Sequence, residues 1–232
     1  MHIYAFGSLC RGEVSFGSDV DVLAITEGFD SRFDPDAFSI YSYKRICDLW
    51  KDGNPFAWHL ATEAKLIFAS NGINFLAELG APSQYTRCAE DCLKFARLYE
   101  HAIEALKKEE CSAVFELSNV FLAVRNFATC FSLGTSKVAN FSRHSARRLG
   151  VRSLNLSENA YRLLERSRIL STRGAGQMLE RSEVDACFDE ICKIGFWINK
   201  LLREITADGR VQQQNGGPAP GAEGSERTTL IR

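Results

Sequence analysis

Two aspartates one residue apart, Asp19 and Asp21, are the side chains whose types and spacing are best suited to chemistry. The segment from Asp19 to Thr26 alternates polar and apolar residues before an apolar run, which predicts a strand. Because alternate residues of a strand point to the same face, we expect the two carboxylates side by side, with Val20 and Val22 directed into the core. Adjacent carboxylates repel each other unless a cation lies between them, and Mg²⁺ prefers such oxygen ligands. The pattern therefore predicts a site for one or two Mg²⁺ ions at these aspartates.

A possible phosphate-binding loop precedes this pair. Gly7 and Ser8 end an apolar segment, residues 1–6, that reads as a strand, and residues 9–14 are expected to form a short helix capped by Ser8. Glycine lets a phosphate approach the backbone closely, and a helix N-terminus offers free N–H groups to it. Ser8 adds a hydroxyl donor and Arg11 a positive charge. The candidate nucleotide-binding residues are Gly7, Ser8, Arg11 and Ser18.

Together the carboxylate pair and the loop suit a metal-bound nucleoside triphosphate. In that chemistry a hydroxyl attacks the α-phosphorus while metal ions neutralise charge on the attacking and leaving oxygens. Asp19 and Asp21 are thus the candidate catalytic residues as well as the candidate metal ligands. The combination of an apolar strand, Gly-Ser, Arg-Gly, Ser-Asp-x-Asp and a second apolar strand is more specific than any one fragment.

The segment Gly7–Ile25 resembles the signature of the DNA polymerase β-type nucleotidyltransferase superfamily, especially its minimal and kanamycin-type members. The resemblance extends over roughly the first 80 residues, and its specific motif is confined to about 20 of them. It implies Mg²⁺, a nucleoside triphosphate that we expect to be ATP, and transfer of a nucleoside monophosphate to a small-molecule or protein acceptor. By motif position, it implies that Gly7 and Ser8 hold the triphosphate and that Asp19 and Asp21 bind metal.

One departure from the family pattern leaves a second function open. The family usually supplies a third carboxylate from a following strand, but the predicted third strand, residues 38–44, contains no acid. Asp36 or Glu63 are candidate substitutes, although Asp36 also fits a turn and Glu63 a solvated helix face. His59 fits either a role near the cleft or a hydrogen-bonded, half-buried position. The alternative function is a non-catalytic nucleotide- or partner-binding, antitoxin-like module of the same fold.

Periodicity predicts an α+β protein, with a small mixed sheet followed by an α-helical bundle. Strands are expected at 1–6, 19–26 and 38–44, and helical spacing runs from Pro55 to Phe68 and again over 73–79. Further helices are expected near 84–109, 112–133, 155–170 and 181–206. The predicted divisions are a nucleotidyltransferase domain at 1–82, a helical bundle at 83–206 and a disordered tail at 207–232.

Charge is distributed unevenly along the chain. Residues 1–80 carry a net charge of −5, whereas residues 136–181 carry +7. We expect the basic segment, which includes Lys137, Arg143, Arg147 and Arg148, to face the cleft and help hold the triphosphate, in the same chain or across a homodimer. The alternative is that these arginines decorate an outward helix face.

Composition limits the partners and the location. The chain has 232 residues, a net charge of −1 and 45% apolar residues, which is ordinary for a globular protein and gives no argument for nucleic acid. No apolar run reaches the ~20 residues of a membrane span, and no signal peptide is evident, so we expect a cytoplasmic protein.

Arg125-Asn126 is similar to the start of HEPN ribonuclease motifs, but Cys130 stands where those need a histidine. We therefore expect no ribonuclease activity and interpret the two as a helix-capping or interhelical pair.

Overall fold

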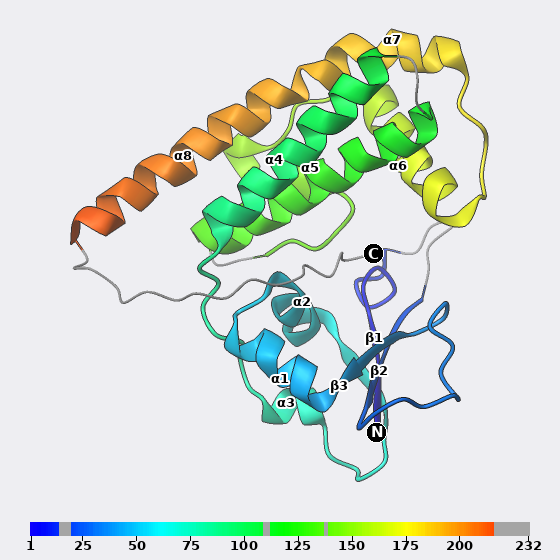
Figure 1. Cartoon of the computed structure of the whole chain (residues 1–232), viewed down its shortest axis with the longest axis vertical. Helices are drawn as coiled ribbons and strands as arrows, with labels where there is room; N and C mark the ends of the chain where they lie inside the picture. The colour runs from blue at the N-terminus through cyan, green and yellow to red at the C-terminus, as the bar shows by residue number, and fades with distance from the viewer. Residues whose placement is uncertain (14–19, 109–111, 137–138, 216–232) are drawn as a thin grey trace.

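A computed structural model describes residues 1–13, 20–108, 112–136 and 139–215, with side chains described as far as residue 207. Figure 1 shows a sheet with short helices beside it and a separate group of longer helices packed above them. The α+β class predicted from the sequence is confirmed, because a small mixed sheet comes first and helices follow it.

The sheet has the strand order β3-β2-β1-β4. Its first strand, β1, is antiparallel to both of its neighbours, and β2 runs parallel to β3. Phe6 at the end of β1 pairs with Asp21 at the start of β2, so the loop that follows β1 leaves the sheet beside Asp21. The strands are β1 (His2–Phe6), β2 (Asp21–Thr26), β3 (Ser39–Ser42) and β4 (Lys65–Ala69).

The fourth strand corrects one prediction from the sequence. Helical spacing had suggested a single helix from Pro55 to Phe68, but α2 (Pro55–Glu63) ends where Ala64 adopts an extended conformation, with φ −65° and ψ 137°. The apolar residues that follow pair with β1 instead, because a strand edge satisfies their backbone N–H and C=O groups. Short apolar runs fit helix and strand periodicities equally well, which is why the sequence misled here.

Two smaller helices complete this part of the chain. Helix α1 (Tyr43–Lys51) was not predicted from the sequence, and it begins where the Ser42 side chain accepts a hydrogen bond from the Arg45 N–H. The predicted short helix near 73–79 is present as α3 (Phe75–Glu78). Buried side chains of β1, β2, α1, α2 and α3 form one apolar cluster between the sheet and these helices.

The short helix expected after Ser8 is absent from the described residues. Residues 7–12 form successive turns, in which the Arg11 N–H donates to the Gly7 carbonyl (3.3 Å) and the Glu13 N–H to the Ser8 carbonyl (2.9 Å). Gly12 has a φ of +70°, which a helix does not allow. The expectation that Val20 points into the core is also wrong, because β2 begins only at Asp21 and Val20 is 56% exposed.

The helical part follows a loop that contains Pro82. Its helices are α4 (Cys88–Lys107), α5 (Ala113–Ser136), α6 (Glu158–Arg173), α7 (Arg181–Cys192) and α8 (Ile194–Asn215), with 3₁₀ turns at Ser145–Arg148 and Gly150–Arg152. Their buried side chains form a second apolar cluster, centred on α5. The predicted division of the chain near residue 82 stays a prediction.

Two helix predictions near the C-terminus need correction. The single helix expected at 181–206 is two helices, because the Tyr99 hydroxyl binds the carbonyls of Ile191 (3.0 Å) and Cys192 (2.9 Å) and accepts from the Gly195 N–H (3.0 Å). These bonds replace the helical ones at the break. The disordered tail expected from residue 207 is also wrong in part, since α8 continues to Asn215, and residues 216–232 lie outside the described part.

Candidate functional site

The turn after β1 places the backbone of Gly7 against the carboxylate of Asp21. Gly7 has a φ of +75°, and a Cβ atom built on it would lie 2.1 Å from the Oδ2 atom of Asp21. Any other residue would therefore push the carboxylate away as well as strain the backbone. Asp21 itself is partly exposed. The carboxylate and the buried Gly7 backbone thus lie in contact at one end of the central strands β1 and β2, where the sequence predicts phosphate and metal binding.

Part of the predicted site lies outside the described residues. Asp19 and Ser18 both fall in the segment 14–19, so the expected pairing of the Asp19 and Asp21 carboxylates stays a prediction. Ser8 is described and partly exposed, and its carbonyl accepts hydrogen bonds from the N–H groups of Arg11 (3.2 Å) and Glu13 (2.9 Å). The backbone of the turn is therefore held by internal hydrogen bonds.

Arg11 is engaged by two carboxylates rather than left open to a phosphate. Its Nη1 donates to Glu63 Oε2 (2.5 Å), and its Nε donates to Glu13 Oε2 (2.9 Å). Glu63 Oε2 also lies 2.9 Å from His59 Nε2. Glu63 is therefore not a solvated acid on a helix face. It connects the turn to α2, and the charge of Arg11 is balanced within the protein.

The other candidate for a third carboxylate, Asp36, lies in the exposed turn that leads into β3. Its N–H donates to the Asp34 side chain at 2.9 Å, as in a turn stabilised by an aspartate. Among the described residues, no group of three His, Cys, Asp or Glu side chains is arranged to hold a metal ion. What the described part does supply for Mg²⁺ is the partly exposed carboxylate of Asp21, a hard oxygen donor beside Gly7.

His59 joins the sheet-containing part to the helical part. It is buried, and its ring stacks on Phe141 with centroids 4.5 Å apart and an interplanar angle of 15°. The Phe6 ring meets His59 edge-on at 5.4 Å. His59 is therefore a buried, hydrogen-bonded histidine. Through Glu63, which also binds Arg11, it links the Phe141 contact to the turn after β1.

The basic segment predicted to face the cleft is divided between different contacts. Arg148 Nη1 donates to Glu13 Oε1 at 2.7 Å, so it reaches the turn after β1. Arg147 instead binds Glu158 (2.6 Å) and lies over the Tyr161 ring, 4.0 Å from its centroid. Burial raises the pKa of Glu165, and the charge of Arg143 opposes that effect. Lys137 lies outside the described residues.

The charge network gives Glu13 an unusual environment. Partial burial by itself raises the pKa of Glu13, but the hydrogen bonds from Arg11 and Arg148 outweigh it and hold the pKa below its usual range. A lowered pKa means that this network stabilises the fold above the unfolded pKa of glutamate, near 4.5, and loses that contribution as the pH falls.

Arg125 on α5 was predicted to form a helix-capping or interhelical pair with Asn126. The structure does not support that interpretation, because its Nε atom is buried and has no hydrogen-bond partner among the described residues. A signal was present in the sequence. Glu116 and Arg125 are the two charged residues of the 24-residue helix α5, and arginine is rarely buried without a partner.

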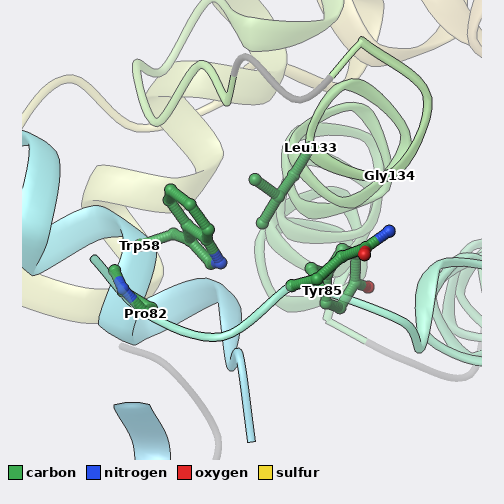
Figure 2. A pocket seen from close by; sticks show the side chains of 6 residues that line it. Trp58, Pro82, Tyr85, Leu133 and Gly134 are labelled. Carbon is green, nitrogen blue, oxygen red and sulfur yellow. The ribbon is translucent and has the colours of Figure 1, made fainter. Parts of the chain in front are cut away.

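The junction between the two parts also contains a small hollow of about 260 Å³ (Figure 2). Trp58 of α2, Pro82 of the connecting loop and Leu133 of α5 converge on it. The Trp58 Nε1 donates to the Ser83 carbonyl at 3.1 Å, which fixes the loop against α2. No charged side chain lines the hollow among the described residues, so we regard it as a packing feature of the junction.

A comparison with protein families agrees with this geometry. A family model described as a nucleotidyltransferase domain matches residues 2–79, which include all four strands and helices α1 to α3. Residues 2–79 are a nucleotidyltransferase domain. The nucleotidyltransferase domain therefore contains the Gly7–Asp21 contact, Arg11 and Glu63, whereas Arg125, Phe141 and Arg148 come from outside it.

Comparisons with curated proteins and with solved structures each returned no match. Across the described residues, no helix is both long and apolar enough to cross a lipid bilayer. The helical part that follows the nucleotidyltransferase domain is thus characterised by its own contacts alone.

Proposed function

We propose that the nucleotidyltransferase domain transfers a nucleoside monophosphate from a Mg²⁺-bound nucleoside triphosphate, most simply ATP, to a hydroxyl group of a small-molecule or protein acceptor. The observation that carries this proposal is the contact between Gly7 and Asp21 within the nucleotidyltransferase domain, where the sequence predicts phosphate and metal binding. A partly exposed carboxylate beside a turn suits a metal ion and the phosphates that accompany it.

In this proposal Gly7 and Ser8 bind the triphosphate, and Asp19 and Asp21 hold Mg²⁺ with Ser18 beside them. Bound Mg²⁺ supplies neutralisation of charge on the phosphate oxygens. The protein orients the reactants so that the acceptor oxygen forms a bond to the α-phosphorus as the bond to the bridging oxygen breaks and pyrophosphate leaves.

A non-catalytic nucleotide- or partner-binding, antitoxin-like module of the same fold is the second candidate. The observation that favours it is the position of the two acids considered as a third carboxylate. Glu63 is bound to Arg11 and His59, and Asp36 lies in an exposed turn. Glu63 is thus bound to other groups, which favours a domain that binds a nucleotide without turnover.

Replacement of Asp21 tests Mg²⁺-nucleotide binding, which both candidate functions require. We expect Asp21→Asn to weaken Mg²⁺-dependent binding of a nucleoside triphosphate by about 100-fold or more, because even the loss of groups that support a metal ligand costs 10–100-fold. The control is Asp36→Asn, which removes an exposed acid from the same domain and should leave binding unchanged. Equal affinities for the wild type and Asp21→Asn, measured by isothermal titration calorimetry, would contradict the assignment.

A further inference from the structure

A cavity of about 320 Å³ lies between the nucleotidyltransferase domain and the helical part, next to the site described above. Its size is in the range of small-molecule sites, and aromatic side chains from both parts form its walls. Its lining includes Tyr41, Phe56, His59, Arg125, Asn126 and Phe141.

The Arg125 guanidinium lines this cavity without a counter-charge bound to it. Its Nε is buried and unpartnered, and no ion pair to its side chain exists among the described residues. Burial lowers the pKa of Arg125, the nearby positive charges of Arg168 and Arg11 lower it further, and Asp21 acts in the opposite direction. An arginine in such surroundings costs stability unless something anionic binds to it.

The backbone of Arg125 is held firmly, in contrast to its side chain. Its carbonyl accepts hydrogen bonds from the hydroxyls of Thr129 (3.1 Å) and Ser145 (2.9 Å). These bonds fix the base of the side chain on α5 and attach the segment after α5 to it. The guanidinium is therefore presented to the cavity from a rigid element, as recognition of a bound group requires.

Arg45 and Lys94 also line the cavity, but both side chains are exposed, whereas Arg125 is partly buried. Glu90 is paired with Arg87 at 2.6 Å, and Asp91 accepts a hydrogen bond from the Tyr85 hydroxyl at 2.7 Å. Arg11, the cation expected from the sequence to meet a phosphate, is bound to Glu13 and Glu63. These carboxylates thus have other partners, whereas the charge of Asp21 acts on Arg125 and would oppose a bound anion in part.

We propose that this cavity is a binding site for a small molecule that carries an anionic oxyacid group, a phosphate or a carboxylate, and that this group pairs with the Arg125 guanidinium. Arginine matches the planar geometry of two oxygens of such a group. The aromatic walls at Phe56 and Phe141 contact the rest of the molecule. The anionic group bound by Arg125 belongs either to the nucleotide or to the acceptor substrate. Assigning it to the acceptor rests on the proposed transfer reaction.

Inorganic phosphate is a sufficient probe, because the test needs binding and not turnover. Calorimetric titration and thermal unfolding of the full chain are compared for the wild type, Arg125→Met, Arg125→Lys and the control Arg97→Met, which removes an exposed arginine of α4. We expect Arg125→Met to weaken phosphate binding about 30-fold or more, the usual effect of losing one partner of a buried charge pair. Arg125→Lys should weaken it less, and Arg97→Met should bind as the wild type does.

Without phosphate, Arg125→Met should unfold at the same temperature as the wild type or higher, because it removes a partly buried charge that has no ion pair in the described part of the chain. A lower unfolding temperature or failure to fold would show a structural role and overturn the proposal. Phosphate binding that is absent from the wild type, or equal in Arg125→Met, would also overturn it.

Repeating the titration with a saturating non-hydrolysable Mg²⁺-nucleotide shows whether the bound anion belongs to the nucleotide or to a second molecule. Loss of phosphate binding assigns the anion to the nucleotide, and unchanged binding assigns it to a second molecule. Asp21→Asn, which tests the transfer function, should leave phosphate binding to Arg125 in place.

Discussion

Gly7 and Asp21 depend on each other for their positions. A Cβ atom at Gly7 would collide with the carboxylate of Asp21, whereas one at Gly12, which has a similar positive φ of +70°, would meet nothing within 4 Å. The two glycines therefore share the backbone requirement and differ in the contact. This makes Gly12 a matched control for Gly7.

Gly7→Ala should cost roughly 1–3 kcal/mol of stability and should weaken Mg²⁺-nucleotide binding, because it strains the backbone and displaces the carboxylate. Gly12→Ala should pay a similar backbone penalty while leaving nucleotide binding near that of the wild type. Urea unfolding and calorimetry of both variants check this. Equal nucleotide affinities in the two variants would show that the Gly7–Asp21 contact has no part in the site.

Glu63 is expected to act through Arg11 and not as a metal ligand. Glu63→Gln leaves Arg11 with one of its two carboxylate partners and should destabilise the fold by about 1–3 kcal/mol. Its effect on Mg²⁺ affinity should be small in comparison with Asp21→Asn. A drop in Mg²⁺ affinity as large as that of Asp21→Asn, with stability unchanged, would make Glu63 the third carboxylate.

At the scale of secondary structure, the 3₁₀ turn Ser145–Arg148 holds two adjacent arginines with different partners. Arg148 reaches Glu13 in the turn after β1, whereas Arg147 binds Glu158 and the Leu156 carbonyl and covers Tyr161. We expect Arg148→Ala to weaken nucleotide binding ~5-fold, which is about 1 kcal/mol, with little change in stability.

Arg147→Ala should show the opposite effect, with lost stability of roughly 1–2 kcal/mol and unchanged nucleotide affinity, since its contacts lie within the helical part. Parallel calorimetry and urea unfolding separate the two. Identical behaviour of both variants would mean that the basic segment has no specific relation to the nucleotide site.

The elements themselves differ in how far the sequence predicts them. Strands β1, β2 and β3 and helices α4 to α6 follow local periodicity and were predicted close to their observed bounds. The break between α7 and α8 was not, because it depends on Tyr99, which is distant in sequence and binds carbonyls at the break. Strand β4 likewise depends on pairing with β1 rather than on its own residues.

At the scale of the whole molecule, the two parts meet through contacts that sequence patterns cannot reveal. The motif identifies Gly7, Ser8 and Asp21, but it gives no indication that Arg11 is bound to Glu63 or that His59 stacks on Phe141. The charge asymmetry along the chain correctly suggested that a basic segment approaches the domain. Within that segment Arg148 contacts Glu13 in the turn after β1, whereas Arg147 binds Glu158.

Transfer of a labelled nucleotide tests the central claim most directly. The wild type and Asp21→Asn are each incubated with Mg²⁺, α-phosphate-labelled nucleoside triphosphates and cell extract. The proposed function predicts a labelled acceptor with the wild type, its absence when Mg²⁺ is chelated, and its loss in a folded Asp21→Asn protein. A labelled product formed equally by both proteins would contradict the role of Asp21, and no labelled product with any nucleoside triphosphate, despite Mg²⁺-dependent nucleotide binding, would contradict transfer and favour the non-catalytic module.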